Sequence, residues 1–483
     1  MSVARLCELI RRRTLSPVEI MEAHLSRAES LNPTLNAVVT FAPDALEQAR
    51  AAERAVMTDD NLPPLHGLPL TVKDTIDTGG LRTTSGSRVR AEHVPAEDAP
   101  AVARLRAAGA IVFGKTNASE LALDYNADNP VFGRTNNPHD LARTPGGSSG
   151  GCAAAVSACL SPASLGSDLV GSIRIPAHFC GVAGLFPTPG RVSGSGHFPP
   201  TTGAFAAGAS LGPLARRIDD LSLLFEALAV RAYDNPHNST HANESSHANE
   251  HGQPVSETQL RGLRVAYCMD DGVVRVTEET ERAVESAAHA LMDAGMEVYE
   301  ARPPEMSRAT ELWLALFSRS VGDVVRAEYA GREGEGGAAV RALLRRESEA
   351  APVAPETYAD AWAERERLRA SLLERMRETP LLLAPVGAVA AFAHGARKVS
   401  VGGGGEINAF RAFGCAQACN VFALPAVSVP GGRTREGLPV GVQIIGRPFD
   451  ERLVLAAARV VEDALGGWRF PVIALPSGGT SPL

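Results

Sequence analysis

The pattern that most constrains the fold of this chain is a helix followed by a glycine and then an apolar strand, which occurs twice. One helical run ends at Gly109 and is followed by apolar residues 110–113, and a second ends at Gly295 and is followed by residues 296–299. Glycine suits the left-handed conformation in which many helices end, and helices that alternate with strands are typical of α/β proteins. We therefore expect a single large α/β/α layered domain over residues 1–483.

Other segments extend this pattern along the chain. Ser16, Pro17 and Glu19 form a helix-capping motif, and we expect the helix that they begin to end at Asn32-Pro33. Apolar runs bounded by turn residues predict further strands at 68–72, 263–268, 381–386, 426–430 and 440–445. Amphipathic runs predict helices at 277–294, 356–378 and 450–465.

A polar segment at about 233–257 departs from this pattern. It contains the sequence His-Ala-Asn-Glu twice and four histidines, His237, His241, His247 and His251. No cysteine and no regular set of carboxylate ligands accompanies these histidines, so the spacing does not favour a metal site. Such a polar tract predicts a mobile, solvated insertion.

Charge and composition exclude several classes of protein. The chain has 47 basic and 55 acidic residues and a net charge of −8, so it lacks the basic surplus that binds nucleic acid. Charged residues interrupt the N-terminus, and no run of 18 apolar residues occurs, so neither a signal peptide nor a membrane span is predicted. Seven cysteines without a CxxC pair fit a reducing compartment. We expect a cytoplasmic protein.

The chemically most informative stretch is residues 144–152, which read Thr-Pro-Gly-Gly-Ser-Ser-Gly-Gly-Cys and precede an alanine-rich run at 153–160. A phosphate-binding loop would end in Gly-Lys. No lysine lies between residues 116 and 397, so this stretch is not such a loop. Residues 146–150 also match the Gly-x-Ser-x-Gly pattern of the α/β-hydrolase nucleophile elbow, which must directly follow a strand. Residues 136–145 have the composition of a loop, which argues against this interpretation. The helix predicted after the glycines argues against a flexible linker, and it would place backbone N–H groups where they attract negative charge.

Several motifs together resemble the amidase signature family of serine amidohydrolases. The central one is Gly146-Gly-Ser-Ser-Gly-Gly151, followed by Gly171-Ser-Ile-Arg-Ile-Pro176 and Phe179-Cys-Gly-Val-Ala-Gly-Leu185. Agreeing blocks occur at 65–74, 114–117, 132–138 and 437–443, and the resemblance extends from about residue 3 to about residue 465. It implies a mixed central sheet covered by helices, and neither a metal nor an organic cofactor.

The resemblance also implies a Ser-cisSer-Lys catalytic triad. It assigns Ser172 as the nucleophile, Ser148 as the bridging serine after a cis peptide bond, and Lys73 as the base. A serine hydroxyl needs a base to become a good nucleophile, and lysine can act as that base only when it is neutral. The apolar strand before Lys73 would bury the amine, and burial lowers the pKa of a lysine.

Backbone amides near Leu169, Val170, Gly171 and Ser172 are expected to form the oxyanion hole. The family usually has glycine at the position of Val170, and a β-branched residue would be strained there if the position requires a positive φ. The substrate-binding residues implied by the resemblance are Leu123, Asp124, Tyr125 and Ser149.

Other polar residues near these motifs are expected to be structural. We interpret Cys152 and Cys180 as small buried side chains, and Arg174 as a hydrogen-bonding brace of the loop. His178 and His394 are isolated histidines, and such residues more often satisfy local hydrogen bonds than act as bases.

The sequence favours a standalone amidase that hydrolyses a small-molecule carboxamide through an acyl-enzyme on Ser172. Two alternatives stay open, the A subunit of a tRNA-dependent amidotransferase and a catalytically inactive relative that acts as a binding subunit. Ile175 stands where that A subunit usually has glutamine, and residues 209–213 replace its usual Ser-Leu-Asp-Gln-Ile-Gly-Pro stretch. The sequence does not determine which amide is cleaved, or whether the chain forms a homodimer.

Overall fold

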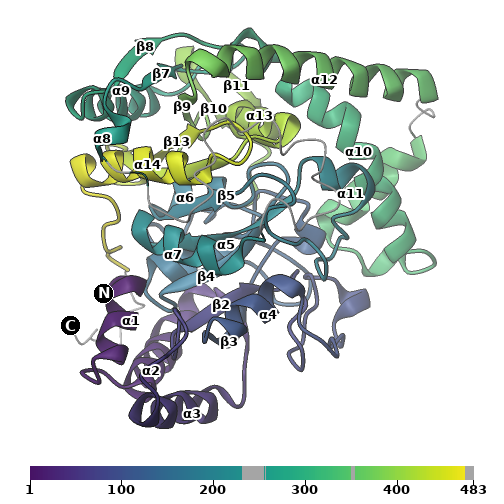
Figure 1. Cartoon of the computed structure of the whole chain (residues 1–483). Helices are drawn as coiled ribbons and strands as arrows, with labels where there is room; N and C mark the ends of the chain where they lie inside the picture. Colours follow the sequence, from purple (N-terminus) through teal and green to yellow (C-terminus); the bar gives the residue numbers. More distant parts are fainter. Residues whose placement is uncertain (231–254, 256, 350–353, 474–483) are drawn as a thin grey trace.

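A computed structural model describes residues 1–230, 255, 257–349 and 354–473 of the chain (Figure 1). The polar insertion predicted at 233–257 lies almost entirely outside the described residues. In the described part, α-helices and β-strands are interspersed along the chain from the first helix to the last, and the strands form one mixed sheet. This arrangement confirms the α/β class predicted from the two helix–glycine–strand segments.

One mixed sheet of eleven strands runs through the described residues, in the order β1-β3-β2-β4-β6-β5-β12-β13-β9-β7-β8. Strand β2 pairs in parallel with β3 and β4, whereas β12 and β13 form an antiparallel pair. The strands of this sheet are β1 (Val38–Phe41), β2 (Pro69–Lys73), β3 (Ile111–Thr116), β4 (Ala163–Asp168), β5 (Ala183–Phe186), β6 (Ser210–Ala215), β7 (Arg264–Tyr267), β8 (Glu297–Glu300), β9 (Leu381–Pro385), β12 (Ala426–Arg433) and β13 (Pro439–Ile445). A separate pair joins β10 (Lys398–Ser400) to β11 (Glu406–Asn408).

Helices lie on both faces of this sheet (Figure 1). The α-helices of the described residues are α1 (Val3–Arg11), α2 (Pro17–Leu35), α3 (Ala45–Thr58), α4 (Pro100–Ala107), α5 (Gly150–Ser157), α6 (Arg174–Cys180), α7 (Ile218–Leu228), α8 (Glu257–Leu260), α9 (Glu278–Asp293), α10 (Ala309–Glu328), α11 (Ala338–Glu349), α12 (Pro355–Glu378), α13 (Gly414–Phe422) and α14 (Glu451–Leu465).

In the central strands, alternate side chains are buried on opposite faces of the sheet. In β9, Leu381 and Leu383 belong to the core under α7, α9 and α14, whereas Leu382 and Ala384 belong to the core under α10, α12 and α13. Successive side chains of a strand point to opposite sides, so a strand covered on both faces is apolar throughout rather than alternating. This arrangement confirms the layered architecture expected from the sequence.

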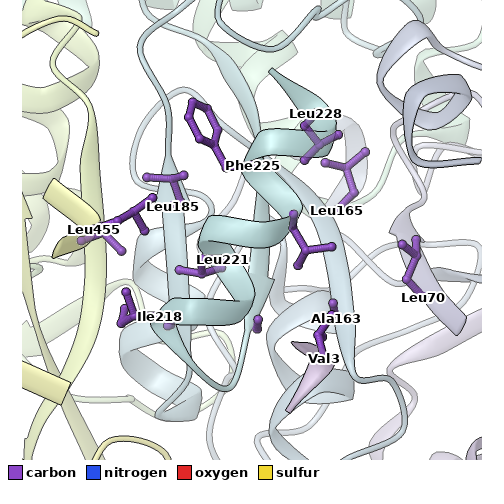
Figure 2. Close-up of a cluster of buried hydrophobic side chains, with 14 of the residues drawn as sticks. Val3, Leu70, Ala163, Leu165, Leu185, Ile218, Leu221, Phe225, Leu228 and Leu455 are labelled. Atoms are coloured by element: carbon purple, nitrogen blue, oxygen red, sulfur yellow. The ribbon is translucent and has the colours of Figure 1, made fainter. Parts of the chain in front are cut away.

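Helix α7 illustrates how one face is packed. Figure 2 shows its apolar side chains among those of the strands and of α14. The labelled members of this group include Leu165, Leu185, Leu221, Phe225, Leu228 and Leu455. Burial of one such leucine or phenylalanine stabilises the fold by about 1.5–3 kcal/mol.

The predicted end of the first capped helix was wrong. Ser16 and Glu19 form the capping box as expected, but α2 continues through Pro33 to Leu35. Proline in the last turn removes only one helical donor, so the helix can continue past it. Asn36 then ends the helix in the left-handed conformation, with its N–H donating to the carbonyl of Asn32 at 2.7 Å.

Candidate active site

Lys73 is the last residue of β2 and its side chain is fully buried. Because β2 runs parallel to β4, the ends of both strands meet at the same edge of the sheet. There Lys73 Nζ lies 2.6 Å from Ser148 Oγ and 2.8 Å from Ser167 Oγ. The structure thus brings together an amine and two hydroxyls from three separate segments.

The environment of Lys73 favours its neutral form. Burial of the amine lowers its pKa from 10.5 to about 8, although Cys152 and Asp168 act in the opposite direction. Removal of a charged group from water disfavours the charged form unless an opposite charge compensates. A substantial fraction of this lysine is therefore unprotonated at mildly alkaline pH.

Ser148 lies in a tightly packed turn before α5. The peptide bond from Gly147 to Ser148 is cis, as the family resemblance implied. A Cβ atom at Gly147 would lie 2.3 Å from the carbonyl oxygen of Asp124, so only glycine fits there. The next residue, Ser149, donates its backbone N–H to the carbonyl of Ser172 at 3.1 Å and so joins the two serine loops.

The loop before Ser172 is held by two aromatic side chains. Trp313 Nε1 donates to the carbonyl of Leu169 at 2.8 Å, and the Tyr125 hydroxyl donates to the carbonyl of Val170 at 3.0 Å. The left-handed position of this loop is Gly171, with a φ of 96°, and Val170 is not among the residues with positive φ. The valine is therefore accommodated without backbone strain.

One predicted oxyanion donor is already occupied. The backbone N–H of Gly171 donates to Asp168 Oδ1 at 2.7 Å. A single N–H so engaged is not available to a substrate oxygen, which argues against the role expected for Gly171. The backbone amides of Leu169, Val170 and Ser172 remain as candidate donors.

Asp168 and Arg174 form a buried ion pair beneath this loop. Arg174 Nε lies 3.1 Å from Asp168 Oδ2, and both side chains have 0% exposure. The guanidinium also donates to Gln443 at 2.9 Å and to Asn420 at 2.7 Å, which confirms Arg174 as a hydrogen-bonding brace. Burial opposes ionisation of Asp168, but Arg174 and further hydrogen bonds outweigh it and lower the pKa of the carboxyl.

A cavity of about 570 Å³ opens onto Ser148 and Ser172. Of the predicted substrate-binding residues, Leu123, Asp124 and Tyr125 line it. Ser149 does not, because it is buried and its hydroxyl donates to the carbonyl of Ser167 at 3.1 Å. The lining is largely apolar and includes Val170, Phe205, Trp313, Val321, Phe392 and Phe410.

Sequence reasoning did not identify several residues of this site. Ser167 contacts Lys73, and His197 Nε2 lies 2.9 Å from Ser167 Oγ while the ring lines the cavity. Ser167 is five residues before Ser172 in the glycine-rich segment, which could have drawn attention to it. His197, Trp313 and Phe410 come from distant segments that carry no local signal.

The other polar residues considered from sequence are structural, as expected. Cys152 and Cys180 are fully buried. His178 Nε2 lies 2.9 Å from the carbonyl of Val389, and its Nδ1 accepts the backbone N–H of Gly441. His394 Nε2 lies 3.2 Å from the carbonyl of Leu141.

Two general features of the described residues bear on the site. Within the ranges given above, no group of three or more His, Cys, Asp or Glu side chains is arranged to hold a metal ion. No helix in those same ranges has both the length and the apolar character needed to span a bilayer.

Comparison with known proteins agrees with these observations. The chain is 37% identical to the A subunit of glutamyl-tRNA(Gln) amidotransferase from Thermus thermophilus, over 94% of this chain and 95% of that protein. Among solved structures, an amidase superposes with a TM-score of 0.83 at 29% identity, covering 96% of this chain and 100% of its own. A 6-aminohexanoate cyclic dimer hydrolase also gives a TM-score of 0.83, at 27% identity, covering 98% and 99% of the two chains.

The model of the Amidase family matches residues 19–455. The chain therefore belongs to the amidase signature family and is a hydrolase that acts on amide bonds.

Proposed function

We propose that this chain cleaves a carboxamide by a Ser-cisSer-Lys mechanism in which Ser172 is the nucleophile, Ser148 the proton relay and Lys73 the base. The observation that carries the proposal is the buried Lys73 amine, which lies 2.6 Å from Ser148 Oγ at the end of a cavity lined by Ser148 and Ser172. A base must lie within hydrogen-bonding distance of the proton that it takes, and Lys73 meets this condition for Ser148.

The reaction proceeds in two halves. Lys73 takes the proton of Ser148 as Ser148 takes that of Ser172, and Ser172 Oγ attacks the carbonyl carbon. The C–N bond then breaks, and the proton held by Lys73 returns through Ser148 to the leaving amine. Water hydrolyses the acyl-enzyme by the same proton route. The candidate oxyanion donors are the backbone amides of Leu169, Val170 and Ser172, and loss of one such donor typically costs about 3–4 kcal/mol of barrier.

The cavity favours an amide with an apolar acyl group. Trp313, Phe392 and Phe410 supply aromatic surface to its wall, and such surface binds apolar groups by burial. A volume of about 570 Å³ is in the range of sites for drug-sized molecules. On this basis we favour a standalone amidase for small-molecule aryl or alkyl amides.

A second candidate is a glutamine-hydrolysing component of an amidotransferase. The Thermus thermophilus relative described above is named as part of such an enzyme, and its identity exceeds that of the two solved structures described with it. Asp124 and Arg397 line the cavity and form an ion pair at 3.3 Å. If a substrate separated this pair, the carboxylate and the guanidinium could bind the ammonium and carboxylate groups of free glutamine.

One set of measurements separates these candidates. Wild-type protein is incubated with a fluorophosphonate, and its turnover of octanoyl p-nitroanilide is compared with ammonia release from glutamine. We expect labelling at Ser172, preferential turnover of the anilide, and loss of labelling and turnover in the folded Ser172→Ala variant. Preferential release of ammonia would favour the amidotransferase candidate. Absence of labelling would favour a catalytically inactive relative and would refute the proposed mechanism.

A further inference from the structure

His197 lies next to the proposed catalytic lysine without touching it. Its ring lines the cavity that opens onto Ser172 and also borders a second cavity, lined in part by residues 192–196. His197 Nε2 lies 2.9 Å from Ser167 Oγ, and Ser167 Oγ lies 2.8 Å from Lys73 Nζ. A chain of hydrogen bonds thus runs from the histidine through one hydroxyl to the amine.

The contact of the other ring nitrogen, Nδ1, determines which group donates in these hydrogen bonds. His197 Nδ1 lies 2.7 Å from the carbonyl oxygen of Pro199. A carbonyl can only accept, so Nδ1 must carry the proton, and in a neutral imidazole Nε2 is then an acceptor. Burial lowers the pKa of His197 to about 3, which keeps the ring neutral. Ser167 therefore donates its hydroxyl proton to His197.

This direction has a consequence for Lys73. A Ser167 hydroxyl that donates to His197 can offer only lone pairs to the amine, so Lys73 must donate to Ser167. A neutral amine has two protons and one lone pair. With one proton directed to Ser167, the lone pair is left for the proton of Ser148, whose Oγ lies 2.6 Å away.

We propose that His197 is a positioning residue for amide hydrolysis: by accepting the Ser167 proton, it reserves the lone pair of Lys73 for Ser148. The inference rests on the proposed function and extends it to a residue outside the triad. Without His197, the Ser167 hydroxyl would be free to rotate and to donate to Lys73. It would then compete with Ser148 for the single lone pair, and the proton relay would be blocked for part of the time.

The other ionisable groups around Lys73 do not supply this function. Cys152 stays protonated, because burial raises its pKa. Asp168 is held by Arg174 and by the backbone N–H of Gly171. His197, by contrast, is connected to Lys73 by hydrogen bonds through the Ser167 hydroxyl.

The test uses the full-length protein and a fluorophosphonate probe, because labelling of Ser172 reports activation of the nucleophile without knowledge of the natural substrate. Rate constants for labelling are measured from pH 6 to pH 10 for wild type and for His197→Leu, His197→Asn, His197→Gln and Ser167→Ala. Asparagine can keep the bond to Pro199 but does not reach the position of Nε2, whereas glutamine can place an acceptor there. His289→Leu, at an exposed position of α9, is the matched control.

We expect His197→Leu and His197→Asn to label about tenfold more slowly on the alkaline plateau, as for loss of one productive hydrogen bond. The midpoint of the pH profile should move to lower pH, because donation from Ser167 stabilises the neutral amine. His197→Gln should recover to within about threefold of wild type. A merely structural role would not shift this midpoint, and His289→Leu should match wild type.

A double-variant cycle completes the test. If His197 acts through Ser167, then adding His197→Leu to Ser167→Ala should slow labelling no further. Equal rates of the single Ser167→Ala and the double variant support the inference. Multiplicative losses, or wild-type rates and midpoints in both His197→Leu and His197→Asn, would overturn it. Failure of wild type to label would instead refute the proposed function, and the inference with it.

Discussion

Lys73 combines two properties that seldom occur together, a fully buried amine and hydrogen-bonding contact with two hydroxyls. Transfer of an isolated ammonium from water into the interior is so unfavourable that the group tends to lose its proton instead. Here that loss is useful, because only the neutral amine can accept a proton. Neutral Lys73 is thus the form that the proposed mechanism requires.

The first residue-scale prediction concerns the pH dependence of the reaction. Because burial lowers the pKa of Lys73 to about 8, the rate of labelling or turnover should rise with pH through about 8 and then level off. Below this pH the amine is protonated and cannot take the proton of Ser148. A profile that is flat from pH 6 to pH 10 would contradict a lysine base.

Substitution of the same lysine supplies the matching variant. Lys73→Met keeps most of the buried volume and removes the amine, so the fold should persist while the rate falls. General-base catalysis typically contributes a factor of about 10²–10⁴, and we expect a loss in that range. The rate is measured with the anilide, and circular dichroism checks the fold. A folded variant that retains more than about a tenth of the wild-type rate would refute the role of Lys73.

The sequence predicted the residues of this site unevenly. Lys73, Ser148 and Ser172 stand in long ordered motifs, so they could be named from sequence alone, although their catalytic roles are still predictions. Ser167 lies near Ser172 in the glycine-rich segment, but its contact with Lys73 is visible only in the fold. His197 could not be named, because its importance depends on a contact between β4 and a loop some 30 residues later. The hydrogen bond from Gly171 to Asp168 was likewise invisible, since no sequence pattern shows where a backbone N–H points.

At the scale of elements, α7 and α14 are joined through a carboxylate. Glu462 of α14 is 3% exposed, and both of its carboxylate oxygens lie 3.2 Å from the backbone nitrogen of Ile218, the first residue of α7. Burial raises the pKa of Glu462 from 4.5 to about 7, although Ile218 and Arg217 act in the opposite direction. The carboxyl is therefore protonated more readily in the folded chain than in the unfolded one.

The stability contribution of Glu462 follows from this difference. A raised carboxyl pKa means that the folded state binds more protons between pH 4.5 and 7, so stability falls as pH rises through this window. A pKa shift this large corresponds to roughly 3 kcal/mol, and it is the net effect that is left after the Ile218 N–H and Arg217 have favoured the charged form. We expect Glu462→Gln to stabilise the protein by about 1–2 kcal/mol at pH 8 and to be neutral at pH 4.5.

Urea unfolding at these two pH values measures the effect. The control is Asp463→Asn, whose carboxyl is on the same helix but mostly exposed, at 63%. This control should change the free energy of unfolding by less than about 0.5 kcal/mol at either pH. Destabilisation by Glu462→Gln at pH 8 would show that the charged carboxylate is the favoured form.

Strands with a clear apolar run were predicted well, and strands without one were not. The strands expected at 68–72, 263–268 and 381–386 correspond to β2, β7 and β9 with shifts of one residue or so. By contrast, β4 has the sequence Ala-Ser-Leu-Gly-Ser-Asp and was not predicted. It is a strand because β2 and β6 pair on either side of it, and such pairing outweighs weak local preference.

At the scale of the whole molecule, one polar cluster joins distant parts of the chain. Arg174 of α6 contacts Asp168 at the end of β4, Asn420 of α13 and Gln443 of β13. These contacts link residues separated by up to 269 positions. The cluster lies beneath the loop that carries Ser172, so distant parts of the chain together support the proposed nucleophile.

Loss of this arginine should therefore be severe. Arg174→Met leaves the charge of Asp168 buried without its counter-ion, and removal of one partner from a buried pair costs about 3–5 kcal/mol. We expect a decrease of that size in the free energy of unfolding, measured in urea. Arg459→Met removes a pair with Asp219 in which both side chains are more than half exposed, and should cost less than about 1 kcal/mol. Similar effects of the two substitutions would contradict the assigned role of the cluster.

The hydrogen bonds from Trp313 and Tyr125 to the carbonyls of Leu169 and Val170 limit how this enzyme can be engineered. Both aromatic residues line the cavity, so replacing either to admit a new substrate would also release the backbone that carries the proposed oxyanion donors. Substitutions at these two positions that change substrate selectivity would therefore also lower the catalytic rate. Phe410 also lines the cavity but packs on both anchors, with its ring centroid 5.8 Å from that of Tyr125 and 5.1 Å from that of Trp313. Phe392 lines the cavity and packs on Phe179 instead, so a library that varies Phe392 first can reshape the pocket while leaving those two anchors in place.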